Sequence, residues 1–485
     1  KFANPRNAAS GSLRQKNPED TKKIPLKFIA YTFGFEKGLK AKNQFDYLQK
    51  LSTWGFKTNR LNKLISGVKN LIQNYNEIEK KRANLDFDID GIVYKVNDFN
   101  LQKRLGNVAN APRWAIAHKF SSNKATSEIN DIEIQVGRTG ALTPVAKIKP
   151  INIGGVLVSN ATLHNEDEII RKDIRIDDTV TVERAGDVIP HVVSVDVSKR
   201  KNTSKKFIFP KKCPCGYDTI KEFNKVTKKF DAIRRCPDRG FECNRIAKEK
   251  LKHFVSKEAF NIDGLGKKII ENFWKLDLIK LPQDIFKLDY EKIQKLDGWG
   301  KLSADNLKYS IDEKKQISFE RFIYSLGIRH IGLENAKLLS KYFGSFQNFK
   351  NLSKNYNYND LMNIDGIGET QVISIKNFFL KNINIKILNE LDKLLNIQDA
   401  KIINTKGLLR DMSFMVTGKL MNISRAEVKS LIEENSGTTV SSVSKKLNFL
   451  ITGEKPTKKK IENAKALKIK IINQDEFLKM LNKSS

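Results

Sequence analysis

The sequence has few cysteines, no long apolar run and no targeting pattern. Its 485 residues include only four cysteines, all within one short stretch, so none is left to pair elsewhere. No uninterrupted apolar segment approaches the roughly 18 residues of a membrane span, and the first residues lack a signal-peptide pattern. We therefore expect a soluble, cytoplasmic protein with no membrane partner.

Acidic residues are also in short supply. Asp and Glu number 55 against 88 Lys and Arg, which gives a formal net charge of +33. A surplus of this sign favours a polyanionic partner, and nucleic acid is the first candidate. Lys, Asn and Ile are used so freely that base composition can have raised the lysine count, so the sign is more informative than the size. The length leaves room for roughly three to five domains.

Two lysines on strand-like runs are the most informative feature. DIDGIVYK ends at Lys95, and RWAIAHKF carries Lys119. Alternation along a strand predicts Val93 on the face of Lys95 and Asp90 on the opposite face, unless a bend at Gly91 intervenes. A nucleotide-transferring enzyme needs fixed ammonium groups where negative charge gathers on a phosphate. The same segment contains a third strand-like run, KFIAYTFGF (27–35), and a helical span at 45–54.

Residues 2–15, FANPRNAASGSLRQ, match a signature of one enzyme family. With DIDGIVYK and RWAIAHKF following in order, the chain resembles the bacterial NAD-dependent DNA ligases. The resemblance implies catalytic roles for Lys95, Lys119 and Asp90, with Asp90 helping to hold a metal. It also implies a pocket for the adenylate and nicotinamide dinucleotide, lined by Arg6, Arg14, Arg82, Asp90, Val93, Lys95 and Lys119. Judged without the family, Arg82 belongs to a solvated basic face.

The family's covalent nucleophile is a lysine in K-x-D-G, upstream of FANPRN. Lys1 precedes Phe2 and lacks the x-D-G that would follow it. One K-x-D-G string occurs at 295–298, but it falls inside a hairpin pattern that recurs elsewhere in the chain. We therefore expect the C-terminal part of a longer ligase, unable to adenylate itself.

Short strands punctuated by Gly and Pro begin near residue 128 and predict a small barrel. In the ligase family this place holds an oligonucleotide-binding (OB) fold, and VGRTGALTPVAKIKP, ATLHN and ERAGDVIP resemble its motifs. The resemblance implies that Arg138 and Arg184 contact DNA phosphates. Without it, each arginine is better interpreted as a surface residue.

The four cysteines form two close pairs, which indicates a structural zinc site rather than disulfides. The first pair is C-x-C, one residue shorter than the C-x-x-C of zinc knuckles and of this family. Reduced cysteines or a degenerate finger are the alternatives. We expect the site to fasten the barrel to the following domain. The predicted ligands are Cys213, Cys215, Cys236 and Cys243.

An internal repeat of the form h-x-G-h-G occupies 262–266, 296–300, 328–332 and 364–368, at intervals of about 32 to 36 residues. Each copy follows a helical stretch and opens another, which is typical of a helix-hairpin-helix. The glycines allow backbone N–H groups to approach DNA phosphates without reading sequence. The third copy, with Arg329 and His330, is expected to pack rather than bind. The predicted DNA contacts are Gly264, Gly266, Gly298, Gly300, Gly366 and Gly368.

The chain ends in a small α/β unit that resembles a BRCT domain, for which contacts with proteins or DNA ends are expected and passive packing is the alternative. The fold class predicted for the whole chain is multidomain α+β. Its predicted divisions are the C-terminal part of an adenylation domain (1–122), an OB fold (123–204), a four-Cys zinc finger (205–246), a helix-hairpin-helix domain (247–390) and a BRCT domain (405–483).

The resemblance covers essentially the whole chain and implies sealing of nicked duplex DNA, with 5′-phosphate and 3′-hydroxyl ends, in replication and repair. AMP would pass from NAD to the upstream lysine, then to the 5′-phosphate, and the 3′-hydroxyl would displace it, assisted by Mg²⁺ or Mn²⁺. We expect a nucleoid-associated bacterial monomer that also holds Zn²⁺.

The main rival is a non-catalytic DNA-binding scaffold with a degenerate transferase domain, which would have no need of the pocket residues. An ATP-dependent ligase or capping enzyme shares the transferase logic but lacks FANPRN and the four hairpins.

Overall fold

The computed structural model describes residues 5–481, except for 16, 35–37, 39–40, 109–110, 122, 154–155, 185–188, 203, 225–227, 238–240, 355–356, 365, 401–406, 422, 424, 441–442 and 445–446. The chain divides into two compact units. The first comprises 1–135, 143–210 and 231–233, and the second comprises 136–142, 211–230 and 234–485. Among the described residues, no helix is both long and apolar enough to cross a bilayer.

The amino-terminal part of the first unit is built around an antiparallel pair of strands, β1 and β4. A helix covers 44–53, as the sequence predicts for 45–54. The strand predicted at 27–35 is wrong for its described part, 27–34, which has no partner strand; Ala30 N bonds to Lys57 O instead (2.8 Å). The elements are α1 (Pro5–Leu13), α2 (Pro18–Lys22), α3 (Gln44–Thr53), α4 (Val68–Lys81), η1 (Arg82–Asn84), β1 (Gly91–Lys95), α5 (Phe99–Leu105), β2 (Asn107–Val108), β3 (Ala111–Pro112) and β4 (Ala115–Lys119).

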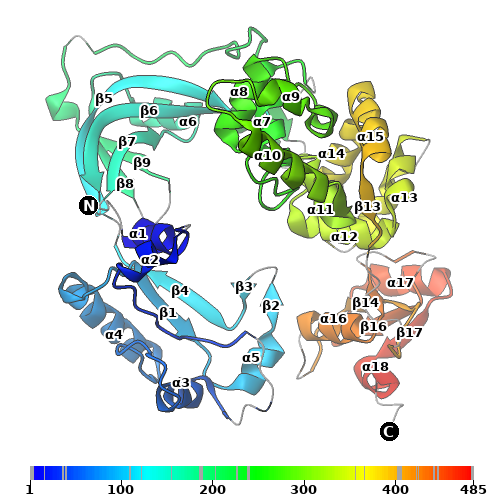
Figure 1. Cartoon of the computed structure of the whole chain (residues 1–485). Helices are drawn as coiled ribbons and strands as arrows, with labels where there is room; N and C mark the ends of the chain where they lie inside the picture. The colour runs from blue at the N-terminus through cyan, green and yellow to red at the C-terminus, as the bar shows by residue number, and fades with distance from the viewer. Residues whose placement is uncertain are drawn as a thin grey trace. The chain divides into compact units, whose positions relative to one another are not determined.

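A closed barrel forms the rest of the first unit, with strand order β5-β6-β7-β9-β8. Figure 1 shows its two longest strands, β5 and β6, curving together as a ribbon. Apolar side chains alternate along the strands, and Ile129, Val180 and Val182 are fully buried. The predicted barrel is confirmed. Its elements are β5 (Asn123–Val136), β6 (Leu142–Ile153), β7 (Val156–Thr162), α6 (Glu166–Lys172), β8 (Thr179–Arg184), β9 (His191–Val195) and η2 (Val197–Lys199).

Most of the second unit is helical and shares one apolar core that extends from Leu251 to Leu391. An antiparallel hairpin, β10 (Ile220–Asn224) with β11 (Lys229–Arg235), precedes the helices. The helices are α7 (Asn244–Phe254), α8 (Lys267–Lys275), η3 (Pro282–Lys287), α9 (Tyr290–Ile293), α10 (Lys301–Glu313), α11 (Phe319–Ser325), α12 (Leu333–Phe343), α13 (Phe346–Lys350), η4 (Asn351–Ser353), η5 (Tyr358–Asn363), α14 (Glu369–Phe379) and α15 (Asn382–Leu394). A short strand among them, β12 (Gln316–Ser318), pairs in parallel with β13 (Asn396–Gln398).

The last part is a parallel sheet with helices packed around it, in strand order β15-β14-β16-β17 (Figure 1). Its strands are short apolar runs such as FLIT and KIIN, as expected for a parallel sheet covered by helices. The multidomain α+β fold class is confirmed. The elements are β14 (Ser413–Thr417), α16 (Arg425–Glu434), β15 (Thr438–Thr439), β16 (Phe449–Thr452), α17 (Lys458–Ala466), β17 (Lys470–Asn473) and α18 (Gln474–Leu481).

Candidate functional site

The register of β1 and β4 places both lysines on one face of this two-stranded sheet. Gly91 pairs with Lys119, and Lys95 pairs with Ala115. Because directly paired residues share a face and neighbours along a strand alternate, this face carries Lys95 and Lys119 about 13 Å apart along the strands, with small side chains between them. We call it the lysine face. Its residues are Gly91, Val93, Lys95, Ala115, Ala117 and Lys119.

Asp90 also reaches the lysine face. It lies just before the first residue of β1, and its carboxylate accepts a hydrogen bond from Lys119 Nζ at 2.7 Å. Strand alternation no longer constrains a residue outside the strand, so the predicted opposite placement does not hold. Gly91 allows the two strands to lie this close, because a Cβ there would meet His118 O at 2.5 Å and Lys119 Cα at 2.8 Å.

Lys95 is the less neutralised of the two cations. Its Nζ donates to the carbonyl oxygen of Tyr31 at 3.3 Å and lies 5.0 Å from the centre of the Tyr31 ring. Among the described residues, no carboxylate pairs with it, and burial lowers the pKa of Lys95. A partly desolvated ammonium group without a counter-ion is suited to attract a phosphate.

The opposite face of the same strands is held by aromatic side chains that sequence reasoning missed. The Tyr75 hydroxyl, on α4, donates to Lys119 O at 3.0 Å, and its ring stacks on His118 with centroids 3.9 Å apart. The Tyr94 hydroxyl lies 3.1 Å from His118 Nδ1. The available signal was the alternation of His118 away from Lys119, which points the imidazole toward α4.

The predicted arginines do not join the lysine face in the described residues. Arg82 Nη2 donates to Asn123 Oδ1 at 3.3 Å, and its guanidinium lies 5.5 Å from the Phe120 ring centre. Arg14 follows α1 as an exposed residue, with no described side-chain contact to the lysine face. The backbone of Arg6 belongs to α1, while its side chain lies outside the described residues.

The two arginines predicted to contact DNA from the barrel both have protein partners. Arg138 lies in the turn between β5 and β6, in the part of the chain that belongs to the second unit. Its Nη1 donates to Gly327 O at 3.1 Å within that unit. Arg184 is the last residue of β8 and lies opposite Asn123 of β5. It also takes part in a further interaction within the chain. Neither side chain is a free surface cation, although each keeps further N–H donors.

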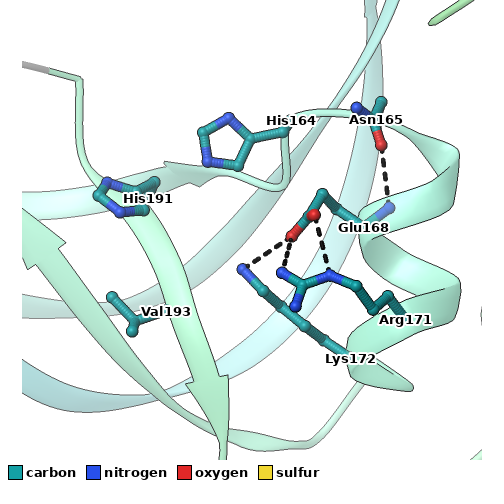
Figure 2. A pocket seen from close by; sticks show the side chains of 7 residues that line it. All are labelled: His164, Asn165, Glu168, Arg171, Lys172, His191 and Val193. Atoms are coloured by element: carbon teal, nitrogen blue, oxygen red, sulfur yellow. Dashed lines mark hydrogen bonds and ion pairs between the residues drawn. The ribbon is translucent and has the colours of Figure 1, made fainter. Parts of the chain in front are cut away.

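A pocket of about 530 Å³ opens on the barrel beside α6 (Figure 2). Arg171 donates to both carboxylate oxygens of Glu168, at 3.0 and 2.7 Å, and Lys172 Nζ lies 3.1 Å from the same group. These bonds lower the pKa of Glu168 to about 2. The rings of His164 and His191 face one another with centroids 5.4 Å apart. In this pocket one carboxylate partners both cations, whereas on the lysine face Lys95 has no carboxylate partner among the described residues.

The four predicted zinc ligands meet in the second unit. All four Sγ atoms lie within 4.8 Å of one another, and no disulfide joins them. Tetrahedral zinc with Zn–S bonds of about 2.3 Å requires sulfur separations of about 3.8 Å. The short C-x-C turn still brings Cys213 and Cys215 together, with Sγ atoms 3.0 Å apart, because Gly216 adopts φ +90° and its N–H closes the turn onto Cys213 O. The four thiolate donors fit a zinc ion in number and type, and binding it would require the Cys213 and Cys215 sulfurs to move apart by about 0.8 Å.

The thiols differ in their tendency to ionise. Burial, with smaller contributions from neighbouring thiols, raises the pKa of Cys215 to about 12. Burial acts in the same direction on Cys243, but hydrogen bonds from Cys215 and from the N–H groups of Ile246 and Arg245 outweigh it and lower the pKa of Cys243. Cys243 stands at the N-terminus of α7, where such N–H groups are unpaired. A bound dication would drive the remaining thiols to ionise.

The four hairpin turns have one backbone design. The third residue of each has positive φ: Gly264 +82°, Gly298 +74°, His330 +64° and Gly366 +93°. The fifth residue is a glycine that N-caps the next helix, and no atom lies within 4 Å of a Cβ placed at Gly266 or Gly300. The first turns of α8 and α10 carry no acid, whereas α14 begins with Glu369. The first and second hairpins therefore present the least obstructed anion sites.

Two residues of the third hairpin have partners within the protein, which agrees with the prediction that this copy packs but does not test it. Arg329 Nη1 donates to both carboxylate oxygens of Glu222 on β10, at 2.8 and 2.7 Å. His330 takes the left-handed position that glycine occupies in the other turns, and Asn335 Nδ2 donates to its carbonyl oxygen at 2.9 Å. These contacts engage the Arg329 side chain and the His330 carbonyl oxygen within the protein.

Comparison with protein-family models gives four matches. They are the NAD-dependent DNA ligase adenylation domain at residues 1–123, the NAD-dependent DNA ligase OB-fold domain at 126–204, a helix-hairpin-helix motif at 321–388 and the BRCT domain at 404–481.

Whole-chain relatives are proteins named DNA ligase. The one from Pelagibacter ubique (strain HTCC1062) is 69% identical over 485 residues, covering 100% of this chain and 72% of that protein. The one from Wolbachia pipientis wMel is 45% identical over 489 residues, covering 99% and 72%. The one from Rickettsia bellii (strain RML369-C) is 43% identical over 493 residues, covering 99% and 70%.

A lysine face on paired strands, a closed barrel and a hairpin array, in this order along the chain, are the parts of a nucleotide-transferring enzyme that acts on DNA. The extent and level of identity make the assignment specific: this chain belongs to the NAD-dependent DNA ligase family.

Proposed function

We propose that this chain supplies the phosphate-stabilising face and the duplex-binding part of an enzyme that seals nicks with 5′-phosphate and 3′-hydroxyl ends. The observation that carries the proposal is the shared placement of Lys95 and Lys119 on one face of β1 and β4, with Asp90 at its edge. Two cations fixed on paired strands stabilise charge that develops on a phosphate without reorganising.

Three residues of the lysine face and three arginines outside it have proposed roles in binding the nucleotide. Lys95 and Lys119 hold the adenylate phosphate, and Val93, which is 58% exposed, offers an apolar contact to the nucleotide. Arg6, Arg14 and Arg82 remain proposed contacts for the nucleotide and nick phosphates. In the NAD-dependent family, NAD is the AMP donor. The residues named here are proposed to bind it without forming a covalent bond to it.

Asp90 is the proposed protein contact for Mg²⁺ or Mn²⁺. Among the described residues, Asp90 belongs to no group of three or more His, Cys, Asp or Glu side chains that could hold a metal, and it already binds Lys119. This fits a magnesium ion that arrives on substrate phosphates and takes only one or two protein carboxylates. When bound, the ion would supply additional positive charge at the phosphate, and Lys119 would be released toward the same phosphate.

The hairpins are the proposed clamp on duplex DNA. We propose that Gly264, Gly266, Gly298 and Gly300 bring N–H groups to backbone phosphates, with Gly366 and Gly368 contributing less because of Glu369. Arg138 and Arg184 are proposed as secondary contacts through their remaining donors. Zinc on the four cysteines would fix the segment at 205–246, which follows the OB-fold part and precedes the hairpin part in the sequence. The proposed domain division is the predicted one: 1–122, 123–204, 205–246, 247–390 and 405–483.

Sealing of a nick that already carries AMP on its 5′-phosphate tests the lysine face without the first chemical step. We expect this chain to seal such a nick slowly and Lys95→Ala to lose roughly 100-fold or more in rate, as for removal of one charge-stabilising donor. Lys27→Ala, an exposed lysine paired with Asp86 at 2.7 Å, is the control and should seal normally. Equal sealing by Lys95→Ala and the control would remove Lys95 from the chemistry. DNA binding without any sealing would favour the scaffold.

We also propose that the 485-residue polypeptide does not adenylate itself. Its K-x-D-G string at 295–298 forms the second hairpin turn, with Gly298 at φ +74°. Incubation with radiolabelled NAD and magnesium should leave the protein unlabelled. A labelled band that disappears in a Lys295→Ala variant would show that this string is the nucleophile after all.

A further inference from the structure

The hairpin of β10 and β11 exposes an aromatic pair that none of the sites above uses. Phe223 and Phe230 are directly opposite across the two strands, with ring centroids 5.2 Å apart and planes at 68°. Phe223 is 52% exposed and Phe230 is 68% exposed. In an edge-to-face pair the edge of one ring covers part of the other, so open ring faces remain on both. Exposed aromatic surface of this kind is a sign of a contact site.

The residues beside this pair carry unneutralised positive charge. Lys228 lies in the turn just before β11 and Lys229 is the first residue of β11, and both are exposed. Neither forms an ion pair within the part of the chain that the structure describes. Lys228 adopts φ +52°, a left-handed conformation that turns the chain sharply into β11. The hairpin end therefore combines two accessible rings with two free ammonium groups.

We propose that Phe223 and Phe230 stack on unpaired DNA bases while Lys228 and Lys229 contact the adjoining phosphates. Ring faces and cations together match a single strand, which offers base faces and charge within one nucleotide spacing. Bases of a continuous duplex offer only their edges in the grooves, so the aromatic pair has no stacking partner there. The chain would then prefer DNA with a gap, flap or frayed end over an intact duplex. This property goes beyond nick sealing and does not require it.

The competing explanation is that the pair merely stabilises the hairpin, since aromatic pairs across strands do so. Leucine separates the two roles, because it keeps apolar packing between the strands but has no ring face to stack. An acidic protein partner would use the same rings and lysines, and it would leave (dT)15 binding unchanged in the leucine variants.

The direct test compares binding of the full chain to fluorescein-labelled single-stranded (dT)15 and to a blunt 15-base-pair duplex at one salt concentration. Phe223→Leu and Phe230→Leu should each weaken (dT)15 binding roughly 10-fold, as expected for one stacked base, and leave duplex binding within about 2-fold. Ile208→Ala, which trims an aliphatic side chain that is 86% exposed, is the control and should change neither.

Equal losses on the two DNAs, or unchanged (dT)15 binding, would overturn the proposal. The melting curves and zinc content of both leucine variants should match the unmodified chain. Two independent readouts complete the test. Lys229→Gln should reduce the salt slope of (dT)15 binding by about 0.7, the value for one released contact to a single strand. Photocrosslinking with 5-iododeoxyuridine in the oligonucleotide should label Phe223 or Phe230, and crosslinks confined to other peptides would also overturn it.

Discussion

At the scale of single residues, buried charge identifies the side chains that hold the barrel together. Asp178 is fully buried, and Arg200 donates to both of its carboxylate oxygens, each at 2.8 Å. Arg200→Ala would leave that carboxylate buried with the Arg175 N–H, at 2.8 Å, as its remaining donor among the described residues, and breaking such a buried pair costs about 3–5 kcal/mol. We expect a drop of this size in the free energy of unfolding, measured by urea denaturation of the barrel-containing unit.

The matched control for this prediction is Arg171→Ala. Arg171 also pairs with an acid, Glu168, but its side chain is 67% exposed. Exposed pairs contribute less than about 1 kcal/mol. If both variants lost the same stability, the buried network around Asp178 would not be the main support that its geometry indicates.

A second prediction at this scale concerns pH. Burial lowers the pKa of His253 below its ordinary 6.5, although its hydrogen bond to Tyr324 O acts the other way. Burial likewise lowers the pKa values of His164 and His330. Because the folded chain then binds these protons less tightly than the unfolded chain, the free energy of unfolding should fall as pH drops through about 6.5.

Urea denaturation at pH 7.5 and 5.5 measures this effect. The carboxylates with pKa values of about 2, such as Glu128 and Glu390, lose their contribution only as pH falls below 4.5 and do not act in this window. The charged neighbour of His253 is Arg138, whose charge remains in both states. His253→Gln should therefore reduce the difference between the two pH values. An unchanged difference would exclude His253 as a source of the acid sensitivity.

At the scale of elements, the lysine face depends on how closely β1 approaches β4. A methyl group at Gly91 would meet backbone atoms of His118 and Lys119 at 2.5 and 2.8 Å, and neither can move aside as a side chain can. We expect Gly91→Ala to cost about 1–3 kcal/mol, the usual range for overpacking. Amide hydrogen exchange in β1 and β4 should increase, and sealing of the adenylated nick should fall with it.

Gly11→Ala is the control for this substitution. Gly11 lies in α1 with no atom within 4 Å of the added Cβ, so alanine should stabilise the helix by about 0.5–1 kcal/mol. Faster exchange in β1 and β4 with Gly11→Ala as well would show that the assay reports general loosening rather than the strand contact.

The hairpins differ in a way that binding experiments can resolve. Lys301 follows Gly300 at the start of α10 and has no ion pair among the described residues, whereas Lys337 on α12 binds Glu334 at 2.8 Å. Lys301→Gln should weaken duplex binding several-fold and reduce the salt slope by about 1, as for one lost phosphate contact. Lys337→Gln, in the hairpin that packs, should change neither. The reverse result would assign DNA contact to the third hairpin.

At the scale of the whole molecule, the features that the sequence predicts are those that depend on residues close together in the chain. Strand alternation places Val93 with Lys95, glycine spacing locates the hairpin turns, and clustering of cysteines predicts their meeting. What it does not predict are partners far apart in the chain. Gly327 accepts from Arg138 across 189 positions, and Glu222 binds Arg329 across 107. Such contacts depend on packing between elements that no local pattern encodes.

The same reasoning explains the strand that failed to form. The run at 27–35 has strand composition, but β propensity is realised only where a partner strand offers its hydrogen bonds. In the described residues Phe28 and Tyr31 are exposed, and the backbone of Tyr31 instead accepts a bond from Lys95. A segment with the composition of a strand thus provides a hydrogen-bond acceptor, the Tyr31 carbonyl oxygen, for Lys95 on the lysine face.

Because the chain divides into two compact units, removal of zinc tests whether the unit that holds the cysteines is stabilised separately from the other. All four cysteines belong to the second unit, so a metal held there stabilises that unit alone. Metal at about 100 times its dissociation constant contributes about 2.7 kcal/mol, which corresponds to a shift in melting temperature of roughly 5–10 °C for a domain of typical size.

Calorimetry after chelation should show one transition lowered by this amount and the other unchanged, with one zinc released per chain. Cys215→Ser should reproduce the chelated curve without chelator. If chelation lowered both transitions equally, or released no zinc from a folded chain, the cysteines would be reduced thiols in a packed core rather than ligands.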